Sequence, residues 1–134
     1  SANIPLNPLS LAITMGAPFV ARGFAGEKDH LKSLLTEAIL FKGTALVDIL
    51  QPCVSFNRVN TYGWYRERVY QVEKPAENRY EALKLADAWD SKIPIGVLFR
   101  DDSVKSRELK TLFGKSITKE AVDQMVCAKC VMMR

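Results

Sequence analysis

The sequence lacks the long apolar runs of membrane proteins and the long basic runs of many nucleic-acid-binding proteins. Its longest apolar stretches, such as Cys127 to Met133, are much shorter than the roughly 20 residues of a membrane-spanning helix, and no charged-then-apolar leader pattern is visible. The net charge is only +4, and no basic stripe is interleaved with aromatic residues. We therefore expect a soluble, cytoplasmic protein that has neither a membrane nor a nucleic acid as its partner.

Cysteine and histidine are also scarce. The chain has three cysteines, an odd number without the spacing of a small secreted domain, so reduced thiols or metal ligation are favoured over a disulfide framework. The one histidine, His30, lies in the first turn of a predicted helix. General acid–base chemistry is open to it, but we expect a solvated helix residue.

The residues that are present alternate between strand-like and helix-like patterns. The chain has 134 residues, 48% of them hydrophobic, which is enough for one core, so we expect a single domain over residues 1–134. The patterns predict strands over 19–21, 45–50 and 93–99, helices starting at Asn7–Pro8, over 28–42 and from Asn78, a short helix near Trp64, and two further helices over 106–113 and 118–132.

The order strand, helix, strand predicts βαβ crossovers. Such crossovers build parallel sheets covered by helices, so the expected fold class is α/β, with three layers and a mostly parallel sheet. Gly23 to Gly26 is expected to form a turn, and Pro94 indicates an edge or entry position for the last strand. Because three parallel strands form a small, partly uncovered sheet, we expect the later part of a larger domain, either a fragment or a subunit that depends on a partner.

Cys53 is the residue whose position says most about chemistry. It follows the predicted strand 45–50 as part of Gln51-Pro52-Cys53, which places one thiol at the carboxyl edge of the sheet. Open α/β sheets bind ligands and cofactors at that edge. One thiol cannot hold a metal cluster by itself. From the residues alone, a buried structural thiol is therefore the favoured interpretation.

A set of segments spread over much of the chain carries a resemblance to a known family. The segments are Asn7–Ala12, Gly16–Phe24, Lys42–Asn57, Asn60–Tyr62 with Trp64, and Ile93–Val97. In this order they resemble the β subunit of the 2-oxoacid:ferredoxin oxidoreductases, the thiamine-diphosphate enzymes that include pyruvate:ferredoxin oxidoreductase. The block Pro52 to Asn57, followed by Asn60-Thr61-Tyr62, is the most specific part.

The resemblance implies that the chain is the carboxyl-terminal portion of a thiamine-diphosphate-binding β subunit, the later half of that fold. The complete enzyme would oxidatively decarboxylate a 2-oxoacid to an acyl-CoA and pass electrons through a [4Fe-4S] cluster to ferredoxin, with thiamine diphosphate and Mg²⁺ as further cofactors. Cys53 matches the cysteine of the family's Pro-Cys block, so we expect it to be one cluster thiolate of four.

The family's Gly-Asp-Gly diphosphate signature and its other three cluster cysteines lie in the amino-terminal half. This sequence has no Gly-Asp-Gly and no cysteine before Cys53. The implied partners are therefore the amino-terminal part of the same subunit, the α subunit, ferredoxin, the 2-oxoacid and coenzyme A, and we expect the isolated chain to be inactive. Val54 and Phe56 beside Cys53 would fit the dry shell that tunes a cluster's potential. Thiamine contacts and catalytic residues are not assigned.

An arginine-rich and aromatic segment follows the Cys53 block. Arg58, Arg66 and Arg68, with Trp64 and Tyr65, could recognise a phosphate or an acidic ferredoxin, because arginine binds such groups with paired donors. We favour packing against the missing half or a neighbouring subunit, since aromatic residues and arginine are enriched in interface cores.

Three asparagines, Asn7, Asn57 and Asn60, lie next to predicted turns. We expect them to cap backbone groups. In the assembled enzyme, some of them could also line the cofactor cavity.

Other interpretations remain open. Cys127-Ala128-Lys129-Cys130 is a CxxC pair near the end of a predicted helix, where an accidental pair is favoured over a redox or zinc site, although Cys53, Cys127 and Cys130 could gather one ion. The chain could be a non-catalytic α/β subunit-interaction module without its own cofactor. A dinucleotide-type site is disfavoured, because Gly23 to Gly26 has too few glycines for that fingerprint.

Overall fold

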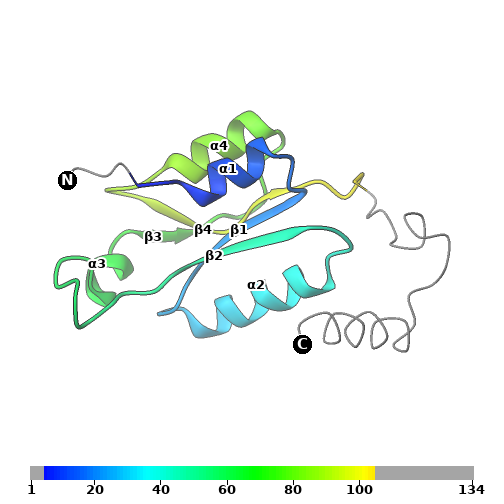
Figure 1. Cartoon of the computed structure of the whole chain (residues 1–134). Coiled ribbons are helices and arrows are strands. Elements are labelled where there is room, and N and C mark those ends of the chain that lie inside the picture. Colours follow the sequence, from blue (N-terminus) through cyan, green and yellow to red (C-terminus); the bar gives the residue numbers. More distant parts are fainter. Residues whose placement is uncertain (1–4, 105–134) are drawn as a thin grey trace, which may run out of the picture.

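The structure, a computed structural model, describes residues 5–104. Its helices are α1 (Pro8–Thr14), α2 (Lys28–Leu40), α3 (Tyr62–Arg66) and α4 (Arg79–Asp87), and its strands are β1 (Phe19–Phe24), β2 (Ala45–Leu50), β3 (Val69–Gln71) and β4 (Ile93–Arg100). The four strands form one sheet in the order β2-β1-β4-β3. Helices α1 and α4 cover one face and α2 covers the other (Figure 1), so the expected three-layer α/β arrangement is confirmed.

The sheet is mostly parallel, as the alternation of strands and helices predicts. β1 pairs with β2 in parallel through the crossover helix α2, and β3 pairs with β4 in parallel through α4. β4 runs antiparallel to β1 and so joins the two parallel pairs. β2 has the predicted bounds, which places its carboxyl end beside that of β1.

Three details of the sheet differ from the sequence-based expectations. β1 continues through Phe24, so the turn predicted at Gly23 starts later, where the Glu27 amide donates to the Phe24 carbonyl. The three-residue strand β3 was not predicted, because Val69–Gln71 is too short to show an alternating pattern. It pairs with β4, so β4 is not an edge strand, whereas the predicted entry position is confirmed because Pro94 is the second residue of β4.

Proline is tolerated inside this sheet because of where its nitrogen faces. The Ile93 amide donates to the Arg68 carbonyl and the Ile95 carbonyl accepts from the Val72 amide, so these neighbours use the side that faces β3. The nitrogen of Pro94 therefore faces the other side, where the pairing of β4 with β1 has already ended at Gly96. The missing N–H costs no ladder hydrogen bond.

The helix starts follow the predicted capping chemistry. The Asn7 side chain accepts hydrogen bonds from the Leu9 and Ser10 amides, and the Asn78 side chain accepts one from the Glu81 amide. These contacts satisfy backbone donors that a first helical turn leaves free. The Asn7 cap also fixes the position of the chain beside the carboxyl ends of β1 and β2.

The core has one part on each face of the sheet and a third under α3. Between the sheet and α1 and α4 lie Leu9, Ile13, Val20, Ala82, Ala86, Leu98 and Phe99; facing α2 lie Phe19, Ala21 and Leu34; and around α3 lie Phe24, Leu50, Tyr65, Ile93 and Ile95. The third part supports the loop that contains Cys53, because it includes Leu50, the last residue of β2 before that loop.

Two predicted helices and two of the three cysteines lie outside residues 5–104. The helices predicted over 106–113 and 118–132, and with them Cys127 and Cys130, lie outside the described residues. Between residues 5 and 104, none of the helices combines the length and apolar character needed to cross a bilayer.

Candidate functional site

Cys53 lies on the surface, three residues after the carboxyl end of β2. Its thiol is free and exposed, so the buried structural thiol favoured from the residues alone is wrong. The Asn57 amide donates to the Cys53 carbonyl at 3.0 Å, which closes one turn immediately after the cysteine. The sulfur is therefore presented at the edge where α/β sheets bind ligands.

The backbone that follows Cys53 affects the charge state of its thiol. The Phe56 and Ser55 amides, and more weakly that of Asn57, interact with the sulfur and lower the pKa of Cys53 from its ordinary value. Hydrogen bonds of this kind favour the charged form of a group. Thiolate is the form that binds metals, so the local backbone favours the chemical form that ligation requires.

Two asparagines stabilise the loop that follows Cys53. The Asn57 side-chain oxygen accepts from the Val59 and Asn60 amides at 3.0 Å each, and its nitrogen donates to the Asn60 side chain at 3.0 Å. The expected capping role of Asn57 is confirmed, and Asn60 contributes to the same network. The loop thus has its own internal bonding, independent of any ligand.

The apolar neighbours of Cys53 do not form a dry shell within the described chain. Val54 is 72% exposed and Phe56 is 95% exposed. The expected enclosure by these two residues is therefore wrong for the described chain, because neither side chain is covered. Any exclusion of water from the sulfur has to come from another part of the protein or from a partner.

The aromatic and arginine-rich segment divides into buried and exposed residues. Tyr65 is buried against Phe24 in the core under α3, and Arg68 stacks over the Trp64 ring at 4.4 Å. Tyr65 and Arg68 thus pack within their own chain, and the predicted packing of this segment against another part of the subunit or a neighbouring subunit stays a prediction. Arg66 is exposed, as is Arg58, and both remain available for contacts with other molecules.

A buried ion pair that the sequence analysis missed lies beneath this segment. Arg22 is 3% exposed, and its guanidinium donates to the Ala86 carbonyl at 2.9 Å, to the Ala88 carbonyl at 3.5 Å and to the Asp48 carboxylate at 3.4 Å. It also lies 5.5 Å from the centre of the Trp89 ring. Arg22 therefore connects β1, β2 and the end of α4.

The sequence does contain a signal for this pair, because Arg22 and Asp48 are the charged residues of two otherwise apolar strands. The register of β1 and β2 places them next to each other. Burial lowers the pKa of Arg22, and the Asp48 charge opposes that change. Together with the neighbouring Asn7 and Trp89, the pair lines a pocket of about 400 Å³ at the carboxyl ends of the strands.

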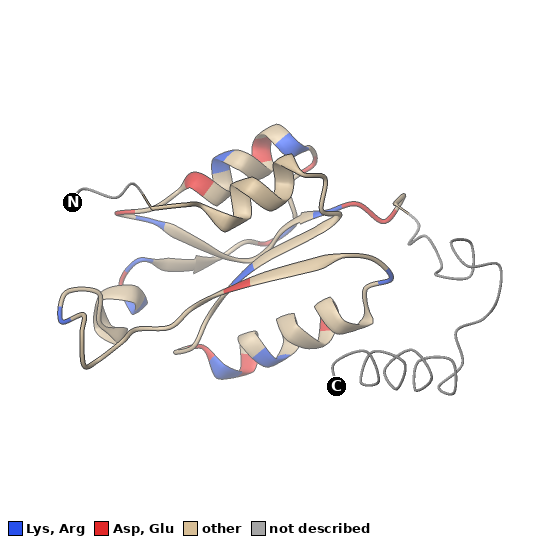
Figure 2. Cartoon of the chain, viewed as in Figure 1, with Lys and Arg blue, Asp and Glu red and all other residues tan. Residues whose placement is uncertain are grey.

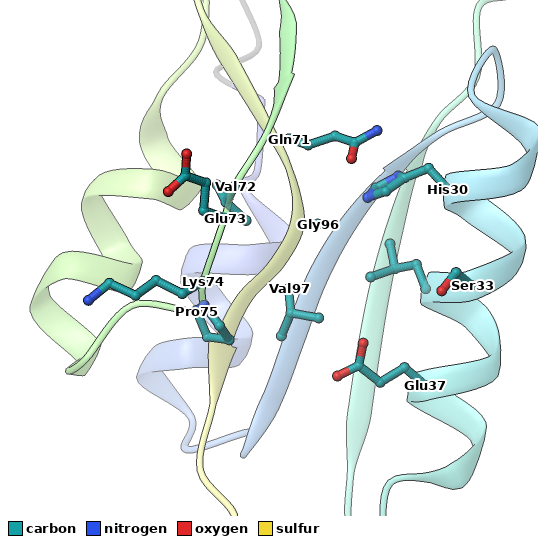
Figure 3. A pocket seen from close by; sticks show the side chains of 11 residues that line it. His30, Ser33, Glu37, Gln71, Val72, Glu73, Lys74, Pro75, Gly96 and Val97 are labelled. Atoms are coloured by element: carbon teal, nitrogen blue, oxygen red, sulfur yellow. The ribbon is translucent and has the colours of Figure 1, made fainter.

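A second pocket, of about 360 Å³, lies between α2 and β3. In Figure 3, His30 from α2 and Gln71 from β3 point toward one another across it. His30 is half-buried, so the predicted solvated position is wrong, and its Nδ1 is buried without a hydrogen-bond partner among the described residues.

Within residues 5–104, no three histidine, cysteine or acidic side chains come together as a metal site. Cys53 is thus one potential ligand, and the ion site that would combine it with Cys127 and Cys130 stays untested because the latter two lie outside the described residues.

Comparisons with known proteins give a consistent result. A sequence-family model for the C-terminal region of the pyruvate ferredoxin oxidoreductase beta subunit matches residues 53–111, starting at the candidate ligand. A 2-oxoacid:ferredoxin oxidoreductase subunit beta from Sulfolobus sp is 40% identical over 79% of this chain and 39% of its own length. Subunit beta of the enzyme 2-oxoacid:ferredoxin oxidoreductase 1 from Aeropyrum pernix is 38% identical over 70% of this chain and 34% of its own length.

A solved structure agrees with these relatives. The 2-oxoglutarate:ferredoxin oxidoreductase from Magnetococcus marinus, with 2-oxoglutarate, coenzyme A and succinyl-CoA bound, matches 96% of this chain with a TM-score of 0.73 and 25% identity, and the match covers 46% of that chain. The present chain spans about two fifths of the length of the first curated relative, 39%.

Proposed function

The chain belongs to the β-subunit family of the 2-oxoacid:ferredoxin oxidoreductases, and on that basis we propose that Cys53 serves the enzyme as one thiolate ligand of a [4Fe-4S] cluster. The complete enzyme would oxidatively decarboxylate a 2-oxoacid to an acyl-CoA and pass the electrons to ferredoxin. When bound, thiamine diphosphate supplies the decarboxylation chemistry and the cluster accepts electrons singly.

The observation that carries this proposal is the presentation of the Cys53 sulfur. It is exposed at the carboxyl end of β2 and approached by the Ser55 and Phe56 amides, which lower its pKa. Amides directed at a cluster sulfur are among the features that set a cluster's reduction potential. The described residues thus fit one cluster ligand together with its local hydrogen bonds.

The described residues do not fit a thiamine-diphosphate and Mg²⁺ site in the same way. The sequence has no Gly-Asp-Gly, and residues 5–104 contain no cluster of three acidic or other metal-binding side chains. We assign these cofactors, and the three remaining cluster ligands, to the amino-terminal part of the subunit. The isolated chain would accordingly be inactive.

The further partners of the proposed enzyme are an α subunit, ferredoxin, the 2-oxoacid and coenzyme A. The neighbouring structure was solved with 2-oxoglutarate, coenzyme A and succinyl-CoA, which supports an acyl transfer to coenzyme A in the present protein. We propose the substrate only as a class, the 2-oxoacids.

The test separates electron transfer from decarboxylation in the complete enzyme. Replacing Cys53 by alanine is expected to reduce ferredoxin reduction to near background, while exchange of labelled CO₂ into the 2-oxoacid persists, because only the former needs the cluster. Ser55→Ala is the matched control, since it keeps the amide that faces the sulfur. Ferredoxin reduction at the unmodified rate in Cys53→Ala would instead support a non-catalytic interaction module.

A further inference from the structure

The two faces of the sheet are covered unequally by the described residues. α1 and α4 lie side by side on one face (Figure 1). On the other face, Leu34 of α2 packs against Phe19 and Ala21 of β1, and α3 packs around Ile93 and Ile95 at the start of β4. A helix is about 10 Å across and covers roughly two strands. The part of β4 and β3 that lies beyond α2 and α3 is therefore left open.

The pocket between α2 and β3 lies on this open part. One wall is formed by His30, Ser33 and Glu37 of α2, the other by residues 71–75, and Gly96 and Val97 of β4 lie between them (Figure 3). We call this hollow the α2–β3 groove.

The α2–β3 groove has the composition of a surface that another segment covers. Val72, Pro75 and Val97 are half-buried, whereas the polar Ser33 and Glu73 are exposed. Interfaces combine an apolar centre with a polar rim in this way. The groove thus offers a small apolar floor with hydrogen-bonding groups around it.

One polar atom of the groove lacks a partner. His30 Nδ1 is buried and has no hydrogen-bond partner among the described residues. Buried polar side-chain atoms are nearly always hydrogen-bonded. Gly96 keeps the space beside this imidazole open, because a Cβ there would lie 3.8 Å from His30 Nε2. A polar group of an occupant would complete the bonding of His30.

The described chain ends beside the groove. Arg100 is the last residue of β4, and its guanidinium donates to Glu37 of the groove at 2.6 Å. Val104 then lines a hollow with Leu40 and Phe41 at the carboxyl end of α2. The residues that follow Val104 therefore start about one helical turn from Glu37.

The sequence after Val104 can supply a helix to fill the groove. The pattern predicts a helix over 118–132, in which Ala121, Met125, Ala128 and Met132 recur three or four positions apart and would form one apolar side. Residues 105–117 can span up to about 40 Å when extended. That length exceeds the roughly 10 Å along α2 between Glu37 and His30.

The charges of this segment and the groove are complementary. Residues 105–134 contain seven Lys or Arg and three Asp or Glu. The groove has the carboxylates of Glu37 and Glu73, and its one ammonium group, that of Lys74, is paired with Glu77. A basic segment is thus favoured over an acidic one as the occupant.

We propose that the helix predicted over residues 118–132 packs into the α2–β3 groove, beside α2. Its apolar side covers Val72, Pro75 and Val97, and one of its polar groups bonds to His30 Nδ1. The inference goes beyond the proposed function and does not depend on it, because no residue of the groove takes part in the Cys53 site.

Photo-crosslinking in the complete β subunit tests where the segment lies. Replacing Ser33 by p-benzoylphenylalanine should give adducts with residues 118–132 of the same chain. The same probe in place of Tyr80 is the control, because Tyr80 is 68% exposed on α4, on the other face of the sheet, and should give no adduct with that segment. Ser33 adducts that all lie outside residues 118–132 would overturn the proposal, and so would adducts that join two copies of the chain.

A double-mutant cycle tests the packing itself. Val72→Ala and Met125→Ala should each lower the melting temperature of the complete β subunit by a few degrees, and the double variant should lose less than the two losses added together, because residues in contact share the loss. Leu83→Ala is the control partner, since Leu83 packs on the side of the sheet that α4 covers, and its loss should add to that of Met125→Ala. Additive losses in both pairs would overturn the proposal.

Neither measurement involves turnover or iron. A crosslinked segment in an enzyme whose Cys53 variants keep the cluster would contradict only the proposed function. An enzyme that needs Cys53 for its cluster but gives no adduct between Ser33 and residues 118–132 would contradict only the inference about the α2–β3 groove.

Discussion

At the residue scale, Arg22 connects the strand that precedes Cys53 to the rest of the fold. Its guanidinium joins Asp48 of β2 to the Ala86 and Ala88 carbonyls at the end of α4. A buried charge is tolerated when it is paired and hydrogen-bonded in this way. The position of β2, and therefore the start of the Cys53 loop, is tied to this contact.

Replacing Arg22 by methionine tests that dependence. The substitution keeps the apolar stem but leaves Asp48 and two carbonyls without their donor, so the free energy of unfolding should fall by about 2–4 kcal/mol. Urea denaturation of the chain measures the change. Arg66→Met is the control, because Arg66 is exposed and should change the same quantity by no more than about 0.5 kcal/mol. Similar losses in both variants would refute the assigned role of Arg22.

The sequence predicted individual residues where their role depends on close neighbours in the chain. Asn7 and Asn57 cap amides within a few residues, and those contacts were expected from turn and helix-start chemistry. The Arg22–Asp48 pair joins residues that become adjacent only through the register of β1 and β2. That register depends on the whole sheet, which is why the pair was missed.

At the element scale, β4 is the strand that holds the sheet together. It pairs with β1 on one side and β3 on the other. Gly96 lies in it with φ of +119°, a backbone conformation that side-chain-bearing residues rarely adopt. A Cβ at this position would also lie 2.9 Å from Cγ2 of Val72, so the residue that follows β3 packs closely there.

Gly96→Ala is therefore expected to destabilise the chain. Strain and the contact with Val72 should reduce the free energy of unfolding by about 1–3 kcal/mol. Gly63→Ala in α3 is the control, because the nearest atom to its added Cβ is Thr61 Oγ1 at 3.8 Å, and it should be neutral or slightly stabilising. Chemical denaturation of both variants checks the difference, and a stable Gly96→Ala variant would show that β4 tolerates another backbone conformation.

Elements with long, regular patterns were predicted well, and short ones were not. β2 has its predicted bounds and α2 starts where expected. β3 escaped prediction because three residues carry no periodicity and its pairing comes from β4. Pro94 indicated an edge or entry position, and only the entry position holds, because the strands that pair with β4 are set by the whole sheet and not by the sequence of β4.

At the scale of the whole molecule, the two sides of the sheet differ in chemical character. The β3 side has a short edge and the polar pocket of His30 and Glu37, whereas the β2 side has a six-residue edge strand, unpaired among the described residues, with the exposed Ile49 at its end. Cys53 and the exposed Phe56 follow directly from the carboxyl end of β2. The end of β2 thus presents both the candidate ligand and exposed apolar side chains.

The central claim is that Cys53 ligates the cluster, and iron is its most direct readout. The complete enzyme, reconstituted anaerobically, should show a reduced iron content and a diminished or altered electron paramagnetic resonance signal of the [4Fe-4S] cluster when Cys53 is replaced by alanine or serine. Ser55→Ala should leave both unchanged. Iron content and spectra of the Cys53 variants that match those of the unmodified enzyme would contradict the account.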